Sequence, residues 1–147
     1  MQISIIYDSK KGATKTIVGW MAGQLEEEGH SVTLSKPGDD PELSADLIII
    51  GSPIYFERPL PSVKEFIEKN SRTLKEKEFA VFIVGWAKKV YEKARDHIEK
   101  NYFGPLIDPV AGAVKARHMF RGWIAVKDPE QQTEAQAWVN SIIDAAL

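Results

Sequence analysis

The residues best suited to bind a ligand form a short loop near the start of the chain, over 9–16 (SKKGATKT). Ser9 and Thr14 carry hydroxyl donors, and Gly12 lets a ligand approach the backbone closely. An apolar run precedes this loop and a helical apolar pattern follows it. Free backbone N–H groups and the positive end of a helix therefore meet at this point. Such a loop suits the terminal phosphate of a ligand.

Spacing excludes the other common phosphate-binding loops. The chain has neither the Gly-x-Gly-x-x-Gly pattern of dinucleotide sites nor the Gly-x-x-x-x-Gly-Lys-Ser/Thr pattern of Walker loops. A phosphoacceptor receiver domain needs an Asp after its third strand, where this chain has 50–52 (IGS). A solvated, capped turn stays open as the alternative, because Ser, Thr and Gly are common in turns.

Composition excludes several other kinds of site. The chain has no Cys, which excludes disulfides, Cys-ligated zinc, Cys-ligated iron–sulfur clusters and a Cys nucleophile. The three histidines, His30, His97 and His118, show no metal-ligand spacing. No Gly-x-Ser-x-Gly elbow is present, so a hydrolase is not expected.

Charge and length set the general class. The chain has 147 residues, with 19 Lys and Arg against 21 Asp and Glu, and this balance argues against a nucleic-acid-binding surface. The N-terminal apolar run is too short for a signal peptide and lacks its basic lead-in. No apolar stretch approaches the roughly 20 residues of a membrane helix. We expect one cytoplasmic domain over 1–147, with no nucleic-acid partner and no integral membrane segment.

Short apolar runs alternate with helical patterns along the chain. Strands are expected over 1–7, 31–35, 47–50, 79–84 and 110–114. Helices are expected over 13–28, 62–70, 89–101 and 129–146. This alternation predicts an α/β fold with a three-layer, doubly wound, five-stranded parallel sheet.

Ligands of such a sheet bind at the carboxyl ends of its strands. The loops that meet there are 8–14, 51–61, 85–91 and 115–123. The second of them is expected to be a long loop with three prolines. The segment 116–127 is open between an extension of the last strand, an edge hairpin and a cover over the site.

Two motifs resemble those of the flavodoxin family. The segment 5–14 (IIYDSKKGAT) is similar to the family's FMN-phosphate loop. The segment 45–56 (ADLIIIGSPIYF) is similar to its strand and the loop beside the isoalloxazine ring. The resemblance covers essentially the whole chain in the order and length of its elements. It implies the flavodoxin-like fold, strand order 2-1-3-4-5, and FMN bound without a covalent link.

The resemblance also implies site residues, position by position. The phosphate contacts would come from Ser9, Lys11, Gly12, Ala13 and Thr14. The ring contacts of the second loop would come from Pro53, Ile54, Tyr55 and Phe56. In the third loop either Trp86 or Tyr91 would stack on the ring, and the sequence does not choose between them.

The chain departs from the family in two respects. Many members have Gly just after the second-loop aromatic, where this chain has Phe56 and Glu57. A change to positive φ costs such residues on the order of 1 kcal/mol, so the one-electron-reduced flavin is expected to be less stabilised. Residues 85–121 also hold eight Lys and Arg against four Asp and Glu, which is +4 locally. A solvated helix face has the same pattern, but a basic rim would favour acidic partners or anionic substrates.

Three functions follow from the resemblance. The first is an electron carrier between redox partner proteins. The second is an FMN-dependent oxidoreductase acting on a quinone or a porphyrinogen. Segment 111–115 and the basic, aromatic stretch after it support this reading, because they are similar to the flavodoxin-type menaquinone-dependent protoporphyrinogen oxidase. The third is a flavin-free, non-redox module on the same fold.

Overall fold

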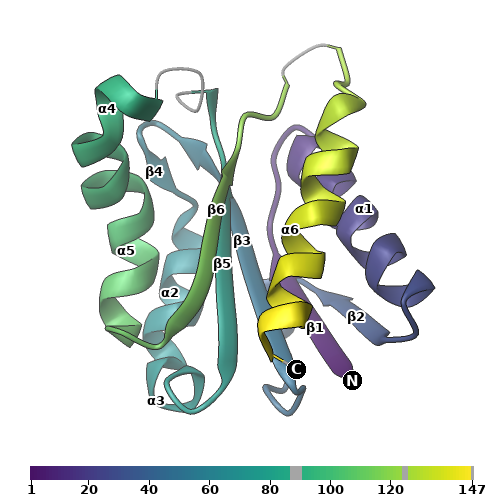
Figure 1. The fold of residues 1–147 in the computed structure, drawn as a ribbon. Coiled ribbons are helices and arrows are strands. Elements are labelled where there is room, and N and C mark those ends of the chain that lie inside the picture. The colour runs from purple at the N-terminus through teal and green to yellow at the C-terminus, as the bar shows by residue number, and fades with distance from the viewer. Residues whose placement is uncertain (87–90, 124–125, 147) are drawn as a thin grey trace.

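The computed structural model describes residues 1–86, 91–123 and 126–146, which form a twisted parallel sheet with helices on both faces (Figure 1). The parallel strands lie in the order β2-β1-β3-β5-β6, which is 2-1-3-4-5 when these five are numbered along the chain. Both the predicted fold class and the strand order are confirmed. The strands are β1 (Gln2–Tyr7), β2 (Ser31–Ser35), β3 (Leu47–Tyr55), β5 (Glu78–Val84) and β6 (Val114–Phe120).

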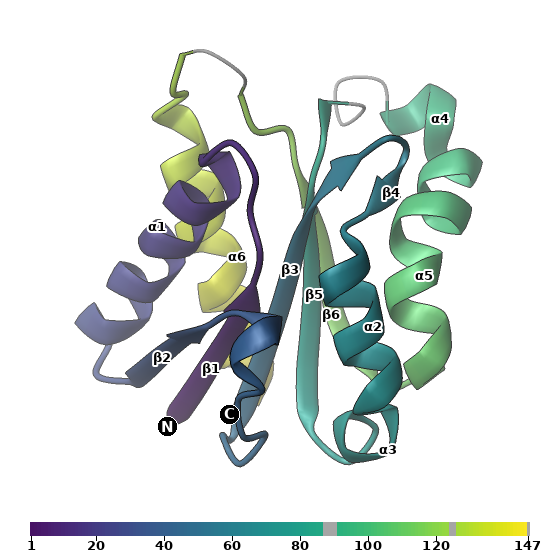
Figure 2. The same cartoon turned by 180° about the vertical axis from the view of Figure 1, so that it is seen from behind.

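Helices cover the two faces of the sheet in separate layers (Figure 2). One face carries α1 (Ala13–Glu27) and α6 (Glu130–Ala146). The other face carries α2 (Pro61–Lys69), α3 (Ser71–Leu74), α4 (Tyr91–His97), the π-helical segment η3 (Ile98–Phe103) and α5 (Gly104–Ile107). Short 3₁₀ turns lie at η1 (Pro37–Asp39) and η4 (Asp108–Val110).

Each face of the sheet has its own hydrophobic core. Successive strand residues point to opposite faces, so Ile49 packs toward α1 and α6 while Ile48 and Ile50 pack toward α2 and α5. Both sets are fully buried. This is why the central strands are continuous apolar runs in the sequence rather than alternating ones.

The prediction of a loop over 51–61 is wrong in its first half. β3 continues to Tyr55 and turns back through a two-residue hairpin into β4 (Arg58–Pro59). The buried Ser52 hydroxyl closes this hairpin, because it accepts a hydrogen bond from the Leu60 N–H at 2.9 Å and donates one to the Pro53 carbonyl at 2.7 Å. Of the residues predicted to contact the ring, Pro53 therefore pairs with β5 in the sheet, and Ile54 and Tyr55 pair with β4 in the hairpin.

The prediction of a strand over 110–114 is also wrong. Pro109 lies in the 3₁₀ turn η4, and the chain then turns through Gly112 at φ 77°. The strand β6 begins at Val114 and pairs with β5, so the first of the three alternatives for 116–127 is correct up to Phe120. Residues 124–125 of that segment lie outside the described residues.

The predicted helix over 89–101 is interrupted. Residues 89–90 lie outside the described residues, and α4 begins at Tyr91. A kink at Ala94 (φ −115°, ψ 16°) and the π-helical η3 follow, so the chain turns irregularly here. Within the described ranges, no helix combines the length and apolar character needed to cross a membrane.

Candidate functional site

A cavity of about 210 Å³ lies at the carboxyl ends of β3 and β5, beside the start of α1. This is the crevice that the topology predicts for a ligand. Ser9, Gly12, Phe56 and Tyr91 are not among its lining residues. The predicted site residues that line it are Lys11, Ala13, Thr14, Pro53, Ile54, Tyr55 and Trp86.

The volume of this cavity is below the roughly 300–1,000 Å³ of most ligand pockets, so it encloses only part of a mononucleotide. A larger groove of about 660 Å³ lies between α2 and η3, lined by Phe56, His97 and Lys100 among others. That groove contains no residue of the first loop. The smaller cavity is therefore the candidate site, because it alone of the two joins the loop to the aromatic walls.

The start of α1 fits an anion. Gly12 caps the helix at φ 94°, no side chain caps it, and its first turn has no acidic residue. By contrast, α6 is capped by Asp128, which accepts a hydrogen bond from the Glu130 N–H at 3.1 Å. The first N–H groups of α1 are thus left for a ligand.

The hydroxyl groups of this loop have different roles. The Thr16 hydroxyl donates to the Gly12 carbonyl at 3.1 Å and so belongs to the helix itself. Thr14 is only 2% exposed and lines the cavity. The Ser9 N–H donates to its neighbour's carboxylate, Asp8 Oδ1, at 2.9 Å, and the Ser62 hydroxyl donates to Asp8 Oδ2 at 2.8 Å. Thr14 is therefore the hydroxyl best placed for a phosphate.

Two aromatic residues, each with a cation over its ring, line the cavity. Lys11 Nζ lies 6.0 Å from the centre of the Tyr55 ring, and the Arg121 guanidinium carbon lies 5.5 Å from that of Trp86. Trp86 is 51% exposed. Tyr91 lies elsewhere, at the start of α4, and its hydroxyl donates to Glu99 Oε1 at 2.6 Å. The structure thus brings Trp86, and not Tyr91, to the cavity.

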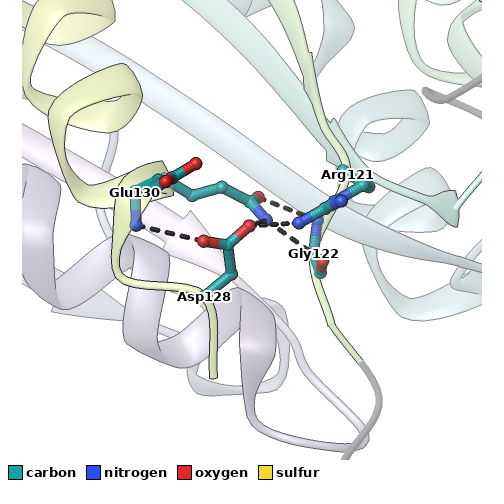
Figure 3. Close-up of polar contacts among 5 residues, drawn as sticks. Arg121, Gly122, Asp128 and Glu130 are labelled. Carbon is teal, nitrogen blue, oxygen red and sulfur yellow. Dashed lines mark hydrogen bonds and ion pairs between the residues drawn. The ribbon is translucent and has the colours of Figure 1, made fainter. Parts of the chain in front are cut away.

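Sequence reasoning missed the third wall of the cavity, Arg121 to Trp123. Figure 3 shows how the start of α6 holds this segment, with Arg121 directed at the Asp128 carboxylate. The buried Gln131 side chain accepts from the Gly122 N–H at 2.9 Å and donates to its carbonyl at 3.1 Å. The only signal in the sequence is the mix of basic and aromatic residues in a loop expected near the site.

His118 does not reach the cavity. Its Nε2 lies 2.9 Å from Glu134 Oε2, and its ring stacks on Trp138 with centres 5.8 Å apart. His118 therefore ties β6 to α6, and we assign it a structural role.

The hairpin turn beside the cavity has an uncommon backbone. Phe56 and Glu57 have φ of 50° and 63°, so the fold already contains the left-handed conformation that is costly for residues other than Gly. Tyr102 donates a short hydrogen bond to Glu57 Oε2, and His97 Nε2 lies 2.9 Å from the same oxygen. The hydrogen bonds from Tyr102 and then His97 lower the pKa of Glu57. The π-helical segment η3 thus holds the turn through Tyr102.

The Tyr102 contact predicts a change in stability at high pH. Burial and the Glu57 hydrogen bond raise the pKa of Tyr102 from 10.0 to about 12. A raised pKa adds stability that is complete below pH 10 and is lost as the pH rises toward 12. We expect Tyr102→Phe to lower the unfolding free energy by about 1–2 kcal/mol at pH 8 and to remove this alkaline loss. Urea unfolding of both proteins between pH 8 and 12 tests it, and equal alkaline slopes would contradict it.

The Phe56 backbone predicts a stabilising substitution. Phe56 is 89% exposed and left-handed, so its side chain gains little from burial while its Cβ carries the steric cost. We expect Phe56→Gly to raise the unfolding free energy by about 1 kcal/mol. Phe56→Ala is the matched control, since it removes the ring but keeps the Cβ. Thermal unfolding in which both variants behave alike would rule out relief of backbone strain.

The doubly wound sheet, with a loop suited to an anion beside aromatic walls, defines the class of this protein as an α/β protein with a candidate ligand site at the ends of its strands. The family described as Flavodoxin domain matches residues 4–128. The chain belongs to the flavodoxin-domain family, as its two motifs predict.

Solved structures share this fold at low sequence identity. Oxidised flavodoxin 2 from Bacillus cereus has a TM-score of 0.69 and 22% identity, covering 99% of both chains. Rubredoxin oxygen:oxidoreductase from Desulfovibrio gigas has a TM-score of 0.69 and 18% identity, and the match covers 99% of this chain but only 36% of that one. A flavodoxin mutant from Fusobacterium nucleatum, bound to flavin mononucleotide, has a TM-score of 0.53 and 13% identity, covering 97% and 93%. No curated protein sequence matches the chain.

Proposed function

We propose that this chain binds FMN without a covalent link and carries electrons between redox partner proteins. The observation that most supports FMN binding is that Thr14 and Lys11 of the first loop line the same cavity as Tyr55 and Trp86, which come from two other segments. FMN needs both a phosphate cradle and flat apolar walls. Membership of the flavodoxin-domain family supports the same cofactor. The proposed unit is a single domain over 1–147, acting in the cytoplasm.

The residues of the chain would bind and orient the cofactor, and FMN when bound supplies one- and two-electron redox chemistry. The N–H groups at the start of α1 and the Thr14 hydroxyl would hold the phosphate. Tyr55 and Trp86 would flank the ring. Ala13 lines the same cavity, whereas Ser9, Gly12 and Phe56 belong to the same two loops but do not line it. The half-exposed Trp86 leaves this side open to a partner.

The visible absorption spectrum is the direct test of cofactor binding. The purified protein is incubated with FMN, desalted and scanned. Flavin bands that survive desalting at one FMN per chain support the proposal. A colourless protein after this treatment would remove the basis of any flavin-dependent function.

Thr14→Ala tests the phosphate assignment. Removing a hydroxyl that hydrogen-bonds a dianion should weaken FMN binding by about 1–3 kcal/mol, or roughly 5- to 150-fold. Thr16→Ala is the matched control, because its hydroxyl is already bonded to the Gly12 carbonyl. Quenching of FMN fluorescence measures both dissociation constants. Unchanged affinity in Thr14→Ala would show that the phosphate binds elsewhere.

A second candidate function is an FMN-dependent oxidoreductase acting on a quinone or porphyrinogen. The observation that favours it is a set of exposed basic residues on α4, η3 and β6, which suits an anionic substrate: Lys93, Arg95, Lys100, Lys115 and Arg117. Lys88 and Lys89, which the sequence adds to this set, lie outside the described residues. A carrier should show two separate one-electron steps and little turnover of small molecules. An enzyme should take up two electrons together and turn over a quinone or a porphyrinogen.

A further inference from the structure

Arg121 lies where no motif of the chain predicts a site residue. It follows β6 directly, lines the same cavity as Thr14 and Tyr55, and lies over the Trp86 ring at 5.5 Å. Its side chain is 35% exposed, so the guanidinium is partly withdrawn from water. A cation in this position acts on a ligand more strongly than a fully solvated surface lysine does.

The structure holds Arg121 in a fixed place. Asp128 pairs with its guanidinium, and Gln131 Nε2 donates to the same Asp128 oxygen at 3.1 Å (Figure 3). These groups, the Gln131 hydrogen bond first, lower the pKa of Asp128, so the pair stays charged through the neutral range. Gln131 also bonds both backbone groups of the adjacent Gly122. The guanidinium is therefore preorganised and needs little rearrangement to meet a ligand.

The charge of the cavity lining is one-sided. Lys11 and Arg121 line it, and no Asp or Glu does so among residues 1–86, 91–123 and 126–146. Asp128 pairs with one of the two cations, Arg121, and does not itself line the cavity. The cavity thus presents net positive charge to whatever it holds.

We propose that Arg121 is a specificity-determining residue of the flavin site, and that its charge makes the site bind the anionic two-electron-reduced flavin more tightly than the oxidised flavin. This inference rests on the proposed binding of FMN. Oxidised FMN takes up two electrons and one proton to give a reduced ring with one negative charge. The reductant in the test is dithionite, which supplies the electrons, and water supplies the proton. Only the product gains from a fixed cation nearby, so the cation raises the midpoint potential.

The test compares Arg121→Gln with Arg117→Gln. Arg117 is a close match. It lies on β6, which Arg121 directly follows, and like Arg121 it pairs with a carboxylate (Glu99, 2.7 Å) and lies over an aromatic ring (Phe103, 5.3 Å), yet it does not line the cavity. Fluorescence titration gives the dissociation constant of oxidised FMN for each protein. Reduction with dithionite in the presence of a reference dye gives the midpoint potential, and the two together give the affinity for reduced FMN.

We expect Arg121→Gln to weaken binding of reduced FMN about tenfold more than binding of oxidised FMN, which lowers the two-electron midpoint by about 30 mV. Arg117→Gln should leave the ratio of the dissociation constants for oxidised and reduced FMN unchanged. Arg121→Lys should keep most of the preference for reduced FMN, because it keeps the charge. Equal ratios in Arg121→Gln and Arg117→Gln would overturn the inference. Equal losses in Arg121→Gln and Arg121→Lys would also overturn it, since charge would then not be the cause. If the unsubstituted protein fails to bind oxidised FMN, the proposed function fails first, and this inference falls with it.

Discussion

Gly51→Ala should lower the unfolding free energy by at least about 3 kcal/mol, which is a large part of the stability of a domain of this size. A Cβ at Gly51 would lie 1.9, 2.2 and 2.4 Å from three atoms of the Phe82 ring. Phe82 is fully buried and has edge contacts with Phe120 and Trp138, both with ring centres 6.0 Å away. The ring has no free space to enter, so β3 and β5 would have to separate.

Urea unfolding measures this loss of stability, and two further variants show whether the clash with Phe82 is its cause. Gly23→Ala lies in α1 with no atom within 4 Å of the new Cβ, so it should gain about 0.5–1 kcal/mol from helix propensity. Replacing the opposing ring by a smaller side chain, in Phe82→Leu, should lower the unfolding free energy of the unsubstituted protein, but it should do so less in the Gly51→Ala background, where it relieves the clash. If Gly51→Ala lowered the unfolding free energy by less than about 1 kcal/mol, β3 and β5 would adjust easily to the new Cβ, and the clash with Phe82 would not limit this position.

The position of Gly51 also shows that residues of one motif can serve the fold rather than the ligand site. The sequence 51–55 (GSPIY) reads as a ring-binding loop. In the structure Gly51 makes room for Phe82, and the Ser52 hydroxyl closes the hairpin onto Leu60. Only the last three residues of the motif line the cavity. Its first two residues would therefore keep their roles even without a ligand.

The parts of the fold that sequence predicted are those with local, periodic signals. The buried strands around Ile5, Ile49 and Val81 are continuous apolar runs, which have few alternative placements. The last strand was predicted with the wrong bounds, because over 114–118 its sequence alternates part-buried and exposed residues as edge strands do, and only Met119 and Phe120 are buried. Its position depends on pairing with β5, and this is a long-range contact that no local pattern encodes.

The candidate site divides in the same way. Lys11, Ala13 and Thr14 of the first loop and Pro53 to Tyr55 line the cavity as predicted, because each group belongs to a contiguous motif at a strand end, whereas Ser9, Gly12 and Phe56 of the same motifs do not line it. Arg121 to Trp123 was not predicted, because that segment has no regular structure of its own and is placed by a helix that begins several residues later. Its position depends on one side chain, Gln131, whose burial only the folded structure reveals.

Gln131→Leu is therefore the substitution that should affect this wall most. It replaces the amide with an apolar group of similar size and leaves the buried Gly122 N–H and carbonyl without their partners. Each unpaired buried backbone group costs about 1–3 kcal/mol, so the unfolding free energy should fall by roughly 3 kcal/mol. The wall itself would loosen, and affinity for FMN should fall as well.

Gln132→Leu is the matched control, because that residue is exposed on the same turn of α6. Gln131→Glu adds a second test. Its carboxylate still accepts from the Gly122 N–H but cannot donate to the Gly122 carbonyl or to Asp128 Oδ2, and it adds a buried negative charge beside Asp128, so its loss of stability should be at least as large as that of Gln131→Leu. Urea unfolding and FMN titration of all three variants distinguish a local from a global effect. If Gln131→Leu matched Gln132→Leu in both, the Arg121–Trp123 wall would not depend on Gln131, and the preorganisation argued for Arg121 would lose its structural basis.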